Sequence, residues 1–225
     1  MKTSEQVMQR YNEMFRIGKT PWVRKEIPSI VKTFTVLVTK ESKKPKLLDL
    51  GCGNGWLSFY FDSKGIEVEG IDSSHEAIRQ ANQKKERDNL LDTHFRQGDA
   101  LNFPYKNGSF DAVFDRGMFH HQLESSWQKY RKGLLKVLKE DGLFYLGVFS
   151  DNSSKHGFLP KKIGRYWHKA KDSSGYLLYD HFFNEKLLKG IFGKHFKLLE
   201  LEEDVKSSKD GSLLLNCIFK RNKIG

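Results

Sequence analysis

Alternate glycines follow a short apolar run near residue 50. Residues 46–50, Lys-Leu-Leu-Asp-Leu, are mostly apolar, which is typical of a buried parallel strand. Gly51, Gly53 and Gly55 come next, and the apolar and aromatic side chains of residues 56–61 suit one face of a helix. Glycines let the backbone approach a ligand closely, and the free amides of a first helical turn favour polar or anionic groups. The pattern predicts a cradle of the nucleotide-binding type.

An acid stands at the distance from this turn that ribose recognition requires. Asp72 closes a second predicted strand, residues 67–72, and lies 21 residues beyond Gly51. At this spacing a carboxylate accepts hydrogen bonds from ribose hydroxyls. Ser73 comes directly after it, and Ser73 with Glu76 predicts a capping box for the next helix.

The glycine spacing also bears on which nucleotide is bound. A dinucleotide fingerprint runs G-x-G-x-x-G, and Trp56 stands at its third glycine position. The run Asp49-x-Gly51-x-Gly53-x-Gly55 instead resembles the first motif of the class I S-adenosylmethionine-dependent methyltransferases. In that family the glycine turn lies against the methionine part of the cofactor. The resemblance implies S-adenosylmethionine as cofactor and S-adenosylhomocysteine as product.

The same resemblance implies further cofactor contacts. In this family an acid at the end of the third strand usually contacts the adenine amino group, and Asp99 matches that position with the Ala100 amide beside it. Trp22, in a tight turn, is either part of a lid over the cofactor or a core anchor between two helices. The predicted cofactor-binding residues are Trp22, Asp49, Gly51, Cys52, Gly53, Asp72, Ser73, Asp99, Ala100 and Asp115.

Alternating strand and helix patterns predict an α/β fold with a parallel sheet. Two late strands joined by Asp210-Gly211 predict an antiparallel hairpin at one sheet edge. The resemblance implies a Rossmann-like, seven-stranded, mostly parallel sheet whose last strand is antiparallel, with helices on both faces. The strands are expected at residues 46–50, 67–72, 93–97, 110–115, 143–149, 196–203 and 212–220, and a long helix at residues 125–139.

We expect residues 1–225 to form one methyltransferase domain, because neither repeats nor linkers interrupt the chain. Within it, residues 1–44 are an N-terminal helical extension that serves as a lid and helps to exclude water. Residues 45–149 are the cofactor-binding core. Residues 150–225 are a substrate-side insertion and the C-terminal hairpin, and residues 150–180 are expected to be loops with one short helix.

Acceptor chemistry is expected where the chain leaves the fourth strand, because ligands in open α/β sheets bind beyond the carboxyl ends of the strands. Asp115-Arg116-Gly117, residues 18–22 (Gly-Lys-Thr-Pro-Trp) and residues 191–194 (Ile-Phe-Gly-Lys) look like the thiopurine and thiol methyltransferase-like branch, which includes tellurite-resistance relatives. That resemblance implies a substrate-pocket role for Arg116 and a small-molecule acceptor, with a thiol as the best guess. The structural alternative for Arg116 is an ion pair with a strand-end acid.

The nucleophile decides whether a base is needed. A thiolate is accessible near neutral pH, so Arg116 would only stabilise its charge. A hydroxyl or amine acceptor requires a base, and His120 or His121 is placed to serve, although both could instead pack or cap a helix start. The predicted catalytic residues are therefore Arg116, His120 and His121. The cysteines, histidines and acids show no metal-ligand spacing, so no metal is expected.

Composition sets the remaining limits. The 225 residues carry a formal net charge of +11 and only two cysteines, and no apolar run approaches the ~20 residues that span a bilayer. With no secretory signal at the start, a cytoplasmic enzyme without a membrane partner is expected. Lysines interleaved with aromatics over residues 155–171 support an alternative, an RNA methyltransferase or RNA-binding protein. A nucleic-acid partner is nevertheless the less favoured prediction, since no RNA-binding module is recognisable.

Overall fold

The computed structural model describes residues 2–23, 26–90, 92–156, 162–163, 167–171, 177–204 and 213–223. Its helices are α1 (Lys2–Arg16), α2 (Ser29–Glu41), α3 (Trp56–Asp62), α4 (His75–Asp88), α5 (Trp127–Val137) and α6 (Glu185–Phe192). Its strands are β1 (Lys46–Leu50), β2 (Glu67–Asp72), β3 (Thr93–Gln97), β4 (Phe110–Arg116), β5 (Leu138–Phe149), β6 (Lys162–Ile163), β7 (Trp167–Lys171), β8 (Leu177–His181), β9 (Phe196–Asp204) and β10 (Leu214–Arg221).

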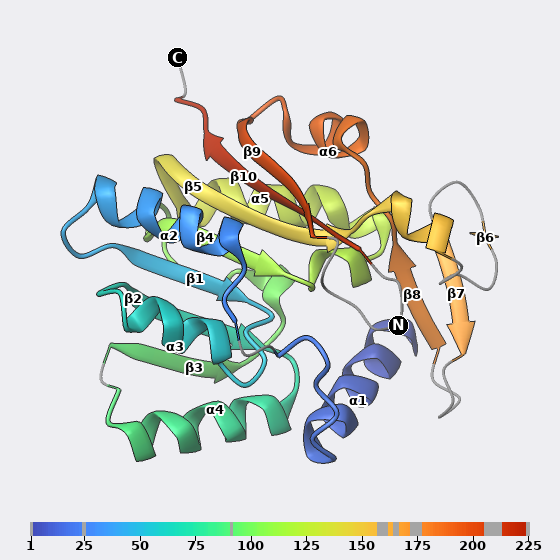
Figure 1. Ribbon diagram of the computed structural model, residues 1–225, viewed down its shortest axis with the longest axis horizontal. Coiled ribbons are helices and arrows are strands. Elements are labelled where there is room, and N and C mark those ends of the chain that lie inside the picture. The colour runs from blue at the N-terminus through green and yellow to red at the C-terminus, as the bar shows by residue number, and fades with distance from the viewer. Residues whose placement is uncertain are drawn as a thin grey trace.

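Seven strands form one sheet in the order β3-β2-β1-β4-β5-β10-β9 (Figure 1). Neighbouring strands from β3 to β5 pair in parallel, whereas β10 runs antiparallel to both β5 and β9. The predicted seven-stranded sheet with a reversed last strand is therefore confirmed. Because β1 lies between β2 and β4, the chain reverses its direction of winding at β1, and ligands bind at this kind of switch point.

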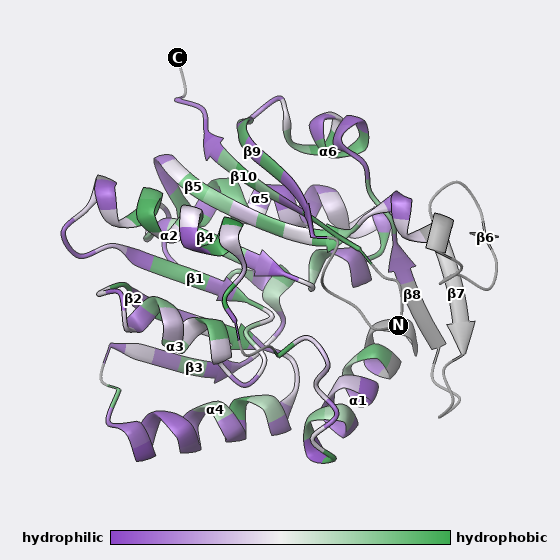
Figure 2. Cartoon of the chain, in the orientation of Figure 1, coloured by the Kyte–Doolittle hydropathy of each residue, from purple (hydrophilic) through white to green (hydrophobic). Residues whose placement is uncertain are grey.

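The central strands are apolar on both faces because helices cover both (Figure 2). On one face, α2 and α3 pack on Leu47 and Phe114, and on the other, α5 and α6 pack on Leu48 and Val113. Alternate residues of β1 and β4 thus enter two separate cores, as the period of a strand requires. This explains the nearly continuous apolar run that marked residues 46–50.

The two helices of the N-terminal extension lie in different parts of the fold. Helix α2 buries Val31, Phe34 and Val38 in the core beside α3, so it belongs to a helical layer and not to a lid. Only α1 stands at the carboxyl ends of the strands, next to β8 and the start of α4 (Figure 1). The expectation of a two-helix lid is therefore corrected. The amphipathic pattern of residues 27–38 correctly predicted a helix but could not show what its apolar face packs against.

The insertion also differs from its prediction. A short 3₁₀ helix at Asp151–His156 agrees with the expected short helix, but β6, β7 and β8 form a second, antiparallel sheet where loops were expected. Much of the basic and aromatic segment 155–171 lies outside the described residues. Among the described helices, none has the length and apolarity that crossing a membrane requires.

Close packing of α5 on Phe103 gives a matched pair of substitutions. An added Cβ at Gly133, inside α5, would lie well inside van der Waals distance of the buried Phe103 ring, whereas Gly190 in α6 is exposed and has open space around that position. We expect Gly133→Ala to destabilise the protein by about 1–3 kcal/mol through overpacking. Gly190→Ala should stabilise it by up to about 1 kcal/mol through helix propensity. Urea unfolding measures both, and equal shifts would contradict the packing of α5.

Candidate active site

The glycine turn joins β1 to α3 in a conformation that other residues rarely adopt. Gly51, Gly53 and Gly55 have φ angles of +70°, +56° and +78°, in the left-handed region. The Gly51 N–H donates to the Ile71 carbonyl over 2.8 Å, which holds the turn against β2. A Cβ on Gly51 would lie 2.8 Å from the Met118 Cβ, so this glycine also permits close approach of the segment after β4.

Asp72 fixes the other side of the turn. Its Oδ2 accepts from the Gly53 N–H over 2.9 Å, and its Oδ1 accepts from the Ser74 N–H over 2.8 Å. Burial raises the pKa of this carboxyl, and the backbone donors oppose that shift. Each carboxylate oxygen has a second lone pair. Asp72 can therefore accept further hydrogen bonds from a ligand while it holds the turn, as the predicted ribose contact requires.

The start of α4 differs by one residue from the prediction. The cap is Ser74, whose Oγ accepts from the Ala77 N–H over 3.1 Å, and Glu76 pairs with Arg79 and does not complete a capping box. Ser73 is exposed, and its carbonyl accepts from Gln97. The sequence offers Ser73 and Ser74 in succession, so it did not determine the register of the cap.

Helix α1 is docked onto these same groups. The Asn12 Oδ1 accepts from the Glu76 N–H over 2.9 Å and from the Ser74 Oγ over 3.1 Å. The Gln80 amide donates to the Phe15 carbonyl over 2.9 Å. The Phe15 ring approaches within 3.0 Å of the place that a Cβ on Gly53 would take. Helix α1 therefore lies directly on the glycine turn, as the expectation of a lid requires.

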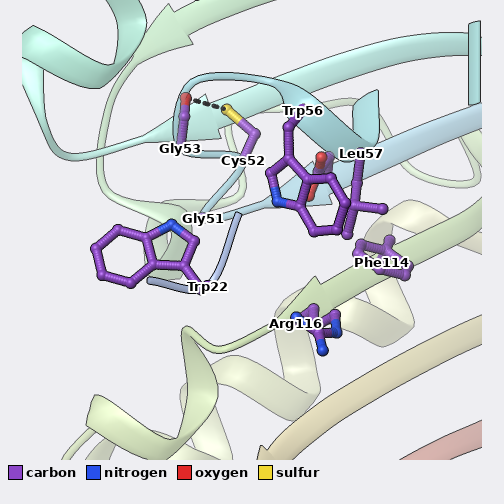
Figure 3. A pocket seen from close by; sticks show the side chains of 9 residues that line it. Trp22, Gly51, Cys52, Gly53, Trp56, Leu57, Phe114 and Arg116 are labelled. Carbon is purple, nitrogen blue, oxygen red and sulfur yellow. Dashed lines mark hydrogen bonds between the residues drawn. The ribbon is translucent and has the colours of Figure 1, made fainter. Parts of the chain in front are cut away.

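A narrow cavity opens between the glycine turn, the Trp22 turn and β4 (Figure 3). Trp22 packs its ring 5.4 Å from that of Tyr11 and 5.6 Å from that of Phe15, so it anchors to α1 and also lines the cavity. The nine lining residues are Trp22, Asp49, Gly51, Cys52, Gly53, Trp56, Leu57, Phe114 and Arg116. Five of the predicted cofactor residues are thereby brought together with Arg116.

Asp49 and Arg116 give this cavity two opposite charges. Asp49 is 3% exposed and accepts from the Ser58 hydroxyl over 2.5 Å. Burial raises the pKa of the Asp49 carboxyl to about 7, despite that hydrogen bond, and nearby Asp115 and Asp72 add to the effect. The Arg116 side chain is 5% exposed and lies 3.7 Å from the Asp204 carboxylate. The ion pair proposed as the structural alternative for Arg116 is thus present, although its partner comes from β9.

Asp115 and Asp99 occupy different surroundings from the cavity. Asp115 is fully buried and accepts from the N–H groups of Met118 and Phe119 and from the Tyr130 hydroxyl. Burial raises the pKa of Asp115 to about 6. Its carboxylate is directed into the core, which fits a role in holding the 116–119 segment better than the predicted direct contact with a cofactor.

Asp99 is exposed at the end of β3, and its Oδ1 accepts from the Leu101 N–H over 2.8 Å. Ala100 beside it is buried. Since β3 pairs with β2 up to Gln97 and Asp72, Asp99 stands on the same rim as Asp72 but does not line the cavity. The position remains compatible with the predicted adenine contact.

A second polar cluster lies where the chain leaves β4. The His121 Nε2 is 2.5 Å from the Tyr11 hydroxyl and 3.0 Å from the His120 Nε2. The His121 Nδ1 is 2.8 Å from the Asp180 Oδ1, at ion-pair distance but without good hydrogen-bond alignment. His120 is 3% exposed and stacks on Phe149, and burial holds its pKa well below the usual value. Of the two predicted histidines, His121 is therefore the one with polar partners from other segments.

Tyr11, Asn12 and Asp180 were not anticipated from the sequence. Tyr11 fitted the apolar face of a predicted helix, and nothing in its neighbourhood distinguishes it from a core residue. Asp180 offered a weak signal, because it interrupts the largely apolar run of residues 177–183. Among the described residues, no group of three or more histidines, cysteines and acids could hold a metal ion.

The buried Asp49 carboxyl should make stability depend on pH. Its raised pKa means that the folded state keeps a proton that the unfolded chain loses, so stability falls as pH rises from about 4 to 7. In Asp49→Asn this penalty, on the order of a few kcal/mol, disappears while Ser58 keeps an acceptor. We expect the variant to be more stable than the wild type at pH 8, and this advantage to shrink at pH 5 and to disappear near pH 4. Thermal melts test this, with exposed Asp92→Asn as the control for charge, and a pH-independent difference would contradict it.

Comparisons with known proteins agree with this geometry. A family model described as "Methyltransferase domain" matches residues 47–142, from β1 into β5. An uncharacterized methyltransferase from Schizosaccharomyces pombe is 34% identical over 113 residues, which are 49% of this chain and 76% of that one. An uncharacterized methyltransferase from Synechocystis sp. is 33% identical over 101 residues and 45% of each chain, so this chain spans about half the length of that relative.

The fold has a close counterpart among solved structures. The 1,6-didemethyltoxoflavin-N1-methyltransferase of Burkholderia thailandensis, solved with 1,6-didemethyltoxoflavin and S-adenosylhomocysteine, superposes with a TM-score of 0.74 at 17% identity, covering 99% of this chain and 90% of that one. That likeness concerns the fold, whereas the Schizosaccharomyces relative and the matching domain carry the family assignment. The chain belongs to the class I S-adenosylmethionine-dependent methyltransferases.

Proposed function

We propose that this protein transfers the methyl group of S-adenosylmethionine to a hydroxyl or amine of a small molecule. The observation that carries the proposal is the His121 imidazole, which stands between Asp180 and Tyr11 beside the glycine turn and its acids. An acceptor that must lose a proton needs a base at this place. The Burkholderia enzyme, which is named for methylation at a nitrogen of a small molecule, supports an acceptor of this class.

The residues around the glycine turn fit a cationic cofactor. Asp49 is a buried carboxyl whose raised pKa shows that its charge lacks full compensation, and a cation would supply the missing partner. We assign Asp49, the 51–53 turn and Trp22 to the methionine side, Asp72 to the ribose and Asp99 with Ala100 to the adenine. When bound, S-adenosylmethionine supplies an electrophilic methyl group on a sulfonium centre.

The chain's own contribution is orientation, exclusion of water and removal of a proton. Orientation is worth up to about 7–11 kcal/mol when two reacting groups are well placed. Tyr11, Phe15 and Trp22 form an aromatic cover above the turn and shield it from solvent. His121 takes the acceptor's proton at Nε2, while neutral, buried His120 supports it from within. In this assignment Asp115 only holds the segment that carries both histidines.

The thiol acceptor remains a narrower alternative. It was implied by the likeness to the thiopurine and thiol branch, with Arg116 beside the nucleophile. Arg116 lines the cavity beside Asp49 and is paired with Asp204. None of the described histidines lines that cavity. Since a thiol needs no base, the His121 cluster favours a hydroxyl or amine.

We also propose a single domain in which residues 150–225 serve the acceptor side, because Asp180 comes from that part. RNA is not favoured as the acceptor, since the Burkholderia enzyme with the same fold is solved with a small-molecule substrate.

A screen of acceptors with labelled cofactor tests the reaction. Phenols, amines and thiols of similar size should be compared at pH 7.5 in wild type and His121→Gln. We expect transfer to a hydroxyl or amine that falls by about 100-fold or more in His121→Gln, since a positioned base contributes about 10²- to 10⁴-fold. Transfer to thiols alone, unaffected by the substitution, would contradict the proposal.

Cofactor affinity tests the ribose assignment separately. Asp72→Ala removes charged hydrogen-bond acceptors worth about 1.5–3 kcal/mol each, so we expect calorimetry to show a cofactor Kd at least about tenfold higher. Asp72→Asn, which keeps one acceptor for Gly53, guards against loss of the turn itself. Exposed Asp92→Ala, at the opposite end of the sheet, is the control. An unchanged Kd in a folded Asp72→Ala protein would refute the assignment.

A further inference from the structure

Three segments far apart in the chain meet at one imidazole. Tyr11 comes from α1, His121 follows β4, and Asp180 comes from β8 of the insertion. We propose that Asp180 is a positioning residue that fixes the proton of His121 on Nδ1. In the absence of an acceptor, the Tyr11 hydroxyl occupies the position at Nε2 that the hydroxyl or amine of the acceptor takes during the reaction. This inference rests on the proposed base role of His121 but makes a statement about the protein alone.

The first step concerns the Nδ1 side. The Asp180 Oδ1 lies 2.8 Å from His121 Nδ1, and Asp180 is only 9% exposed. A carboxylate that can only accept hydrogen bonds favours the imidazole tautomer with its proton on the facing nitrogen. A small rotation of either side chain would turn this contact into an aligned hydrogen bond. In that hydrogen bond the proton stays on Nδ1. The lone pair of His121 is then on Nε2, directed away from Asp180.

The second step concerns the Nε2 side, where both neighbours can be donors. Burial raises the pKa of Tyr11 far above its usual value, so its hydroxyl keeps its proton and donates to Nε2 over 2.5 Å. His120 is neutral because burial lowers its pKa, and its Nε2, which lies 3.0 Å from His121 Nε2, can donate in the tautomer that carries the proton there. A neutral His121 Nε2 has one lone pair, and the Tyr11 hydroxyl, which is the nearer of the two neighbours, occupies it. The Nε2 side therefore favours the same tautomer that Asp180 selects from the other side.

The third step concerns Tyr11 itself. A hydroxyl that donates to a base reproduces what a hydroxyl substrate does just before it loses its proton. Tyr11 is carried by α1, which is docked through Asn12 and Phe15 on the cofactor side of the site. An acceptor can reach Nε2 only when the Tyr11 hydroxyl leaves it. Helix α1 thus acts on the acceptor directly, in addition to covering the glycine turn.

The chemical step balances with these groups. The acceptor's O–H or N–H proton passes to His121 Nε2, and the acceptor heteroatom forms the new bond to the methyl carbon. The carbon–sulfur bond breaks, and its electron pair stays on sulfur. The resulting imidazolium is paired with Asp180. The other titratable or charged groups around it are Arg10, whose guanidinium lies 5.3 Å from the Tyr11 ring centroid, His181 next to Asp180, and Asp115.

Nitrogen NMR of the histidine side chains tests the tautomer without any turnover. His121→Gln identifies the His121 signals among those of the eight histidines. We expect protonated Nδ1 and unprotonated Nε2 in the wild type, and a mixture of tautomers in Asp180→Asn. A wild-type His121 with its neutral proton on Nε2 would overturn the inference, whether or not an acceptor has been found.

Kinetics with the acceptor identified by the screen provide the second readout. We expect Asp180→Asn to lower kcat by about 100-fold, to move the acid limb of the pH–rate profile to lower pH and to leave the cofactor Kd within about twofold. Tyr11→Phe keeps the ring against Trp22 and should lower the acceptor KM about 2- to 10-fold, the value of one competing hydrogen bond, and an unchanged or higher KM would refute the role given to the hydroxyl. Exposed Asp92→Asn is the control. Full activity in Asp180→Asn with an active wild type would refute the positioning role while leaving the proposed reaction intact.

Discussion

Three carboxylates at one edge of the sheet, with Asp49 and Asp115 buried and Asp72 partly buried, are the constraint on which the site depends. Asp115 accepts hydrogen bonds from two backbone amides and the Tyr130 hydroxyl, and Asp72 accepts two from backbone amides. Among the described residues Asp49 receives one, from the Ser58 hydroxyl. A buried carboxylate with a single donor is costly in its charged form. Asp49 thus has the fewest donors of the three, which supports the proposed place of a cationic cofactor beside it.

The same hydrogen bonds link the two halves of the site mechanically. Asp72 holds the turn through the Gly53 amide and the start of α4 through the Ser74 amide. The Ser74 hydroxyl in turn donates to Asn12 of α1. A change at the ribose position is thus transmitted through short polar contacts to the helix that carries Tyr11. If Asp72 binds the ribose and His121 the acceptor, as proposed, these contacts would couple the two events without any long-range rearrangement.

What the sequence predicted well is what local patterns determine. The glycine turn, Asp72 and the positions of the central strands follow from spacing and apolar runs, because short-range sterics and burial fix them, whereas the seven-stranded arrangement followed from the family resemblance. The sequence could not show that α2 packs in the core, that β5 begins at Leu138 directly after α5, or that Ser74 caps α4. In each of these cases the local sequence allows two arrangements almost equally well, and tertiary packing selects one of them. Tyr11 and Asp180 could not be paired with His121, because only the fold brings them together.

The site residues that the sequence predicted lie mainly inside the range of the family match, whereas the partners that it missed lie outside it. The matched residues 47–142 contain the glycine turn, Asp72, Asp99 and both histidines, whereas Tyr11 and Asp180 lie outside it on either side. In the proposed assignment, the matched part holds the cofactor residues and both histidines, and the segments on either side would determine which nitrogen of His121 is free and what reaches it. A change in those two segments would then alter the acceptor without any change near the cofactor.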